Sequence, residues 1–173
     1  FIEGNQIIHM SRLVRKINPQ YVLETGFGSG RTGATIIQSC RKKPILKFIN
    51  CEQNYSLYHP VSDTYKKYFE AMCPYFKAYE KRSFELFRGD FLKEQFPDGI
   101  DWATLDGSPT YEGCLCELLS VCNHINKQGI IYIVSDRNKS QNFNVRDATD
   151  FFANMYSHKF TKTVDDVVGR EIC

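Results

Sequence analysis

The feature that most constrains the fold of this chain is a strand that runs through a glycine-rich turn into a helix. Tyr21–Leu23 have the character of the end of a buried strand, and Glu24 closes it. Glycines then occupy every second position from 26 to 30, and Thr32–Ile37 can begin a helix. Glycine permits a tight turn, positive φ and the close approach of a ligand to the backbone. A strand, glycine turn and helix in this order form the first unit of an α/β domain that holds a ligand at the turn.

Two ligands fit the pattern of this turn. From Gly28 the sequence is G-S-G-R-T-G, which matches the dinucleotide fingerprint, and from Glu24 it is E-T-G-F-G-S-G, the acid-led pattern of methyltransferases that use S-adenosylmethionine. Dinucleotide glycines begin directly after the strand, whereas Gly28 lies four residues beyond Glu24. An acid at the strand end also suits a cationic amino-acid group better than a pyrophosphate. Both observations favour the methyl donor over NAD. A glycine-rich turn without a ligand is also disfavoured, because alternating glycines cost backbone entropy without aiding packing.

Length and composition place the chain among ordinary globular proteins. The 173 residues predict a single domain over 1–173, in which 1–18 supply a helix packed on the core. A net charge of +2 argues against a dedicated nucleic-acid binder. No apolar run approaches the ~20 residues of a membrane span, so no membrane association is expected. The seven cysteines are an odd number, which predicts reduced thiols and a cytoplasmic protein.

Strand and helix patterns alternate along the chain. After the first strand, further strands are expected at Ile45–Cys51, Ser83–Arg88, Ile100–Leu105 and Ile130–Val134, followed by a closing hairpin at Phe160–Val164 and Gly169–Cys173. Helices are expected at Glu3–Ile17, at Thr32–Cys40, from an Asp63 cap to Met72, from a Ser108 cap with Pro109 in the first turn to His124, and from an Asn144 cap. The pattern predicts an α/β fold with a doubly wound, mainly parallel sheet.

Acidic residues follow each of the five predicted parallel strands: Glu24, Glu52, Asp90, Asp106 and Asp136. Ligands of such sheets bind outside the carboxyl ends of the strands, so five acids there predict one polar site. Glu52 lies 22 residues past Gly30, close to the ~20 expected for an acid that binds ribose hydroxyls. Asp90 is placed to accept a hydrogen bond from an adenine amino group.

Three segments carry a family resemblance: VLETGFGSGRTGA, FRGDFLKEQFPDGIDWATLDGSPTYEG and GIIYIVSD. The sequence resembles the class I methyltransferases dependent on S-adenosylmethionine, and within them the small-molecule O-methyltransferases that include the caffeoyl-CoA and catechol enzymes. The resemblance implies an enzyme that transfers a methyl group to a hydroxyl of a small-molecule acceptor. It also implies a seven-stranded Rossmann-like sheet whose antiparallel sixth and seventh strands come from the closing hairpin.

The resemblance further implies that the donor is held at the ends of the first four strands, by Glu24, Gly26, Phe27, Gly28, Gly30, Glu52, Gln53, Gly89, Asp90 and Asp106. Glu24 and the first glycines would hold the amino-acid end, and Glu52 the ribose. Gln53 and Asp90 would lie against the adenine. Asp106 would lie near the transferring methyl group, which makes it the expected catalytic residue and base. The four histidines are alternative bases.

In metal-dependent relatives, Asp106 and Asp136 would also bind a divalent cation such as Mg²⁺, which prefers oxygen ligands. Two departures leave the metal open. Pro109 stands where many relatives have histidine, and Arg137 stands where the catechol enzymes have asparagine. Two other functions stay open: methylation of an amine or a nucleic-acid base, and donor binding without catalysis, because a fold does not fix a function.

Overall fold

The computed structural model describes residues 4–26, 30–40, 47–52, 71, 84–88, 96, 98–134, 142–160, 162–165 and 169–172. Within these ranges the strands are β1 (Tyr21–Thr25), β2 (Lys47–Glu52), β3 (Phe84–Arg88), β4 (Ile100–Leu105), β5 (Ile125–Ile133), β6 (Lys162–Asp165) and β7 (Gly169–Ile172). The helices are α1 (Gly4–Ile17), α2 (Arg31–Ser39), α4 (Tyr111–Val121) and α5 (Asn142–Met155).

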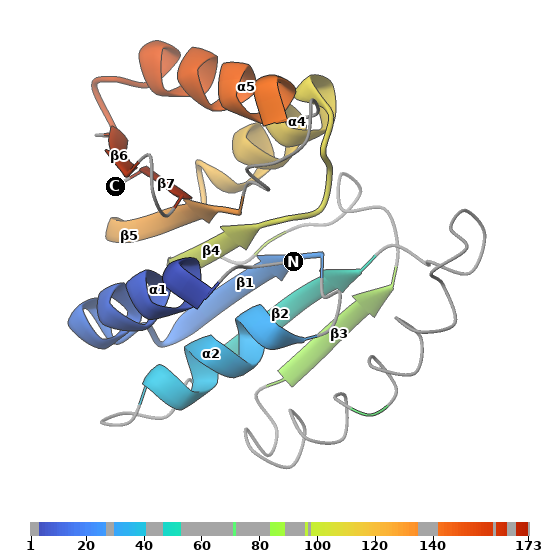
Figure 1. Ribbon diagram of the computed structural model, residues 1–173, viewed down its shortest axis with the longest axis vertical. Helices are drawn as coiled ribbons and strands as arrows, with labels where there is room; N and C mark the ends of the chain where they lie inside the picture. Colours follow the sequence, from blue (N-terminus) through green and yellow to red (C-terminus); the bar gives the residue numbers. More distant parts are fainter. Residues whose placement is uncertain are drawn as a thin grey trace.

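The strands form one sheet in the order β3-β2-β1-β4-β5-β7-β6 (Figure 1). β1 pairs in parallel with β2 and β4, β2 with β3, and β4 with β5. β7 is antiparallel to β5 and to β6. The predicted α/β fold with a mainly parallel sheet is therefore confirmed, and β1 and β4 lie side by side at its centre.

Helices cover both faces of the sheet (Figure 1). Side chains alternate between the faces of a strand, and here both faces are buried. Val22, Trp102 and Tyr132 pack with α1 and α2, and the Trp102 and Tyr132 rings stack with centroids 5.6 Å apart. Leu23 and Ile131 belong to the second core, beneath α4 and α5. This double burial explains why the strands appear in the sequence as nearly continuous apolar runs.

Helix α1 follows its sequence pattern closely. It buries Met10 and Val14 on one face and ends with Arg15 and Lys16, whose charges complement the helix dipole. Asn18 then adopts φ 53, the left-handed conformation that stops a helix. Among the described residues, no helix has the length and hydropathy needed to cross a membrane.

The predicted start of α4 is wrong. Thr110, and not Ser108, is the N-cap, because it is extended and its side chain accepts a hydrogen bond from the Gly113 amide at 3.1 Å. Ser108 instead lies 3.2 Å from the Thr110 hydroxyl, so the Ser108–Pro109 segment belongs to the loop after β4. Both hydroxyl residues have capping chemistry, and the local sequence does not distinguish them.

Other boundaries also differ from the prediction. Asn144 lies inside α5, which begins at Asn142, so the predicted cap at Asn144 is wrong. β5 begins at Ile125 rather than Ile130, through a register shift against β4 between Ile100 and Trp102. The predicted helix from Asp63 to Met72 falls outside the described residues except at position 71.

Candidate functional site

The candidate site lies at the carboxyl ends of β1 and β4. From β1 the sheet continues outward through β2 and β3, and from β4 it continues the other way through β5. Such a reversal of strand order opens a crevice between the two central strands, where α/β sheets bind ligands. The structure brings three predicted site residues to this place: Glu24 and Gly26 from the β1 end and Asp106 from the β4 end.

Gly26 packs directly against the loop that follows β4. Its φ of 76° lies in the left-handed region, which favours glycine. A Cβ built on Gly26 would overlap the carbonyl oxygen of Asp106 and lie 3.2 Å from the Gly107 amide nitrogen. Only glycine therefore fits between the two strand ends, for both conformational and steric reasons.

Asp106 is held to β1 through its backbone. Its amide donates to the Thr25 carbonyl oxygen at 3.1 Å and lies 3.2 Å from the Thr25 hydroxyl oxygen, which accepts the same hydrogen. The Asp106 residue itself is exposed. Its backbone is thus fixed to β1, and the residue lies exposed at the carboxyl end of β4.

Glu24 is fully buried, with 0% of its surface exposed. Because side chains alternate along β1, Glu24 lies on the same face as Val22, toward α1 and α2. A carboxylate so placed favours a nearby positive charge, since burying an isolated charge is costly.

Gly30 begins α2 in the left-handed conformation, with φ 73. The first amides of a helix have no partner within it and carry the positive end of the helix dipole. α2 therefore presents hydrogen-bond donors at the end of the glycine loop, as the sequence predicts.

Sequence reasoning missed Glu117 of α4. Its carboxylate is 7% exposed and accepts a hydrogen bond from the Thr25 hydroxyl at 3.0 Å. Burial raises the pKa of Glu117 to about 7, against opposing hydrogen bonds from Thr25 and from the amides of Gly107 and Ser108. The available signal was its place in the buried stripe of α4, with Cys114, Leu118 and Val121.

Comparison with known proteins identifies the fold. No protein-family model matches the sequence, and no curated protein matches it. Solved structures do match. A putative caffeoyl-CoA O-methyltransferase from Staphylococcus aureus has a TM-score of 0.69 at 14% identity, covering 99% of this chain and 83% of its own. The SAH-bound methyltransferase of Podospora anserina has a TM-score of 0.68 at 14% identity, covering 96% and 76%. The O-methyltransferase from Bacillus cereus in complex with SAH has a TM-score of 0.63 at 12% identity, covering 99% and 82%.

The chain has the Rossmann-like methyltransferase fold. At these identities the similarity concerns the fold, and the roles of individual residues depend on the site itself. Within this fold, the backbone of Glu52 lies at the end of β2, beside the end of β1, where Cys51 is in register with Thr25. The remaining predicted site residues lie outside the described residues: Phe27, Gly28, Gln53, Gly89, Asp90 and Asp136.

The predicted metal pair is described only in part. Asp106 has the carboxylate oxygens that a hard cation prefers, and it stands at the open edge of the site. Across the described parts of the chain, no cluster of three or more His, Cys, Asp or Glu side chains forms a metal site. Because Asp136 is not among them, the metal site stays a prediction.

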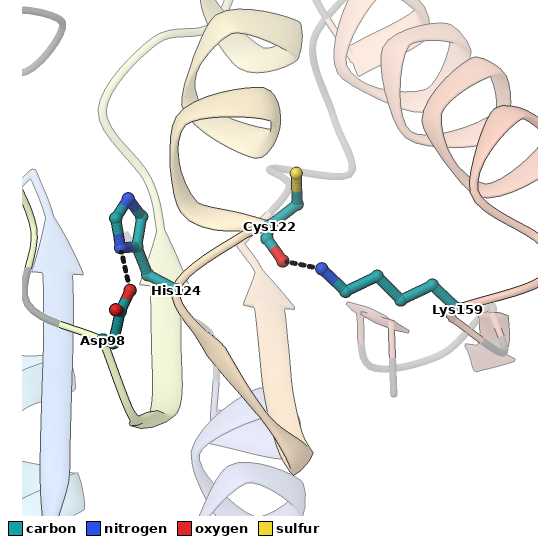
Figure 2. A network of polar contacts seen from close by, with 4 residues as sticks. All are labelled: Asp98, Cys122, His124 and Lys159. Atoms are coloured by element: carbon teal, nitrogen blue, oxygen red, sulfur yellow. Dashed lines mark hydrogen bonds and ion pairs between the residues drawn. The ribbon is translucent and has the colours of Figure 1, made fainter.

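A second group of polar contacts lies at the opposite edge of the sheet, where β4 and β5 begin (Figure 2). His124 Nδ1 lies 2.9 Å from Asp98 Oδ1, and Lys159 Nζ donates to the Cys122 carbonyl oxygen at 2.8 Å. His124, one of the alternative bases, is therefore far from the carboxyl ends of the strands. These contacts fasten the turns before the strands to α4 and the end of α5.

Proposed function

We propose that this protein is a methyltransferase that uses S-adenosylmethionine and methylates a hydroxyl of a small-molecule acceptor. The observation that carries the proposal is the close packing of Gly26 against Asp106 at the switch point of the sheet. It is supported by the likeness to methyltransferases, two of which have SAH bound.

The residues around the crevice have matching roles in this proposal. The glycine loop and the first turn of α2 offer backbone amides to the carboxylate of the donor's amino-acid end. Glu24 supplies negative charge for its ammonium group. Glu52, at the end of β2, binds the ribose, and Gln53, Gly89 and Asp90 lie along the adenine.

When bound, S-adenosylmethionine supplies a methyl group on a positively charged sulfur. The acceptor oxygen forms a bond to the methyl carbon, the carbon–sulfur bond breaks, and its electron pair stays on sulfur. The fixed backbone of Asp106 and the glycine loop align the reactants, which contributes much of the rate in displacements of this kind. The Asp106 carboxylate takes the proton of the acceptor hydroxyl.

A divalent cation at Asp106 and Asp136 would provide a second way to activate the hydroxyl, by lowering its pKa. Pro109 and Arg137 stand where metal-dependent relatives have other residues, so we favour the route in which Asp106 acts without a metal.

The activity test is methyl transfer to a panel of phenols, catechols and amines, with and without chelator, using wild type, Asp106→Asn and Asp136→Asn. We expect transfer to a hydroxyl, slow turnover in Asp106→Asn and little effect of Asp136→Asn or chelator. Loss of activity in both variants and on chelation would instead establish the metal route. Full activity of Asp106→Asn would refute the proposed catalytic centre, and donor binding without transfer to any acceptor would favour a binding module.

A further inference from the structure

We propose that Glu117 is a positioning residue that holds the loops after β1 and β4 at the spacing which donor binding requires. This inference rests on the proposed function, since it concerns the same crevice. Glu117 itself lies on α4 and is nearly enclosed by protein.

The Glu117 carboxylate connects α4 to the end of β1, which is far away in the sequence, and to the loop that precedes α4. Oε2 accepts a hydrogen bond from the Thr25 hydroxyl at 3.0 Å, across 92 residues of chain. The backbone amides of Gly107 and Ser108 interact favourably with the same carboxylate and oppose the rise of its pKa, and Glu117 Oε1 lies against the Gly107 backbone. One side chain thus binds the last residue of β1 and the first turn of the loop after β4.

The Thr25 hydroxyl extends this connection to the expected catalytic residue. It donates its hydrogen to Glu117, and its oxygen accepts the hydrogen of the Asp106 amide at 3.2 Å. The resulting series runs from Glu117 through Thr25 to the backbone of Asp106, so a shift of the carboxylate moves both walls of the crevice.

Packing leaves this arrangement little freedom. A Cβ built on Gly107 would overlap Glu117 Oε1 and would lie 3.1 Å from Glu117 Cδ and 3.3 Å from Thr25 Cβ. A side chain at position 107 would therefore displace the carboxylate from its place beside the backbone.

A buried carboxylate stabilises the fold less than an apolar side chain would at the same position. The neighbours of Glu117 in the buried stripe of α4 are Cys114, Leu118 and Val121, and an apolar residue would avoid the cost of burying a charge. A carboxylate, by contrast, accepts several hydrogen bonds at once and so fixes the two loop ends relative to each other.

The test measures the dissociation constant of S-adenosylhomocysteine by calorimetry for wild type, Glu117→Gln, Thr25→Val and the double variant. Glu117→Gln keeps the size of the side chain but loses one acceptor oxygen. We expect binding about tenfold weaker, because strand ends that Glu117 no longer fixes must be ordered when the ligand binds. The double variant should lose little more than either single one, because both changes break the same bond.

Two control variants separate positioning from general destabilisation. Glu112→Gln removes an exposed carboxylate from the same helix and should bind like wild type. Asp101 lies at the start of β4, and its Oδ2 accepts hydrogen bonds from the amides of Gln20 at 2.8 Å and Tyr21 at 3.1 Å. Asp101→Asn should therefore lower the melting temperature without affecting donor binding.

The outcomes are distinguishable. Unchanged affinity in folded Glu117→Gln, or an equal loss of affinity in Asp101→Asn at equal stability, would overturn the positioning role alone. If Glu117→Gln does not fold, Thr25→Val decides, and unchanged affinity there overturns the role as well. Wild-type protein that does not bind S-adenosylhomocysteine would contradict the proposed function, and the inference with it.

Discussion

Replacing Gly26 by alanine perturbs the contact between the end of β1 and the loop after β4. The residue has φ 76, and the left-handed conformation costs a non-glycine residue about 1–2 kcal/mol. The new Cβ would also overlap the Asp106 carbonyl oxygen and lie 2.8 Å from the Asp106 carbonyl carbon. Because those atoms belong to the backbone, the loops must separate, at a further cost of about 1–3 kcal/mol. We expect the free energy of unfolding to fall by about 2–5 kcal/mol in total.

Gly99→Ala provides the matched control. Gly99 also has positive φ, at 90°, but the nearest atom to its added Cβ is Asn126 Oδ1 at 3.7 Å, and it precedes β4 at the opposite edge of the sheet. This variant should lose only the conformational part, about 1–2 kcal/mol, and keep donor binding. Urea denaturation and S-adenosylhomocysteine calorimetry measure both quantities. Equal losses of stability in the two variants, or normal donor binding by Gly26→Ala, would refute the close packing of the β1 and β4 loops.

Three further predictions concern single carboxylates. Burial raises the pKa of Glu117 from 4.5 to about 7, so the folded state retains a proton that the unfolded state releases between these values. The free energy of unfolding should therefore fall by about 3 kcal/mol as pH rises from about 4.5 to about 7. Glu117→Gln should flatten this part of the pH profile in urea titrations. If the profile of the variant equals that of the wild type, the burial of an ionisable Glu117 is contradicted. Glu52→Ala should weaken donor binding by about 1.5–3 kcal/mol in calorimetry if Glu52 binds the ribose, and unchanged affinity would exclude that role. Asp101→Asn should lower the free energy of unfolding by about 1–3 kcal/mol in urea denaturation, because backbone amides at the start of β1 lose a charged acceptor. An unchanged free energy of unfolding would show that this contact does not stabilise the fold.

Local patterns in the sequence were sufficient for the elements that line the crevice. The predicted strand Ile100–Leu105 coincides with β4, because a short apolar run ended by an acid and a glycine has clear boundaries. The glycines at 26 and 30 both adopt the positive φ that the turn suggested. The acids Glu24 and Asp106 lie at neighbouring strand ends, as the rule for parallel sheets requires.

Contacts between distant segments could not be predicted in the same way. Thr25 and Glu117 are separated by 92 residues, so the burial of Glu117 depends on how α4 packs on β1 and not on its local sequence. The clash that restricts position 26 to glycine likewise involves Asp106, on another strand. Where two residues of equal capping chemistry compete, as Ser108 and Thr110 do, the loop geometry decides, and the local sequence does not fix it.

Calorimetric titration of the wild-type protein tests the central claim most directly. The protein is titrated in parallel with S-adenosylmethionine, S-adenosylhomocysteine and NAD. The acid-led glycine loop packed against Asp106 predicts binding of the first two ligands, one per chain, and none of NAD. Binding of NAD in preference to both, or binding of none of the three, would contradict the account.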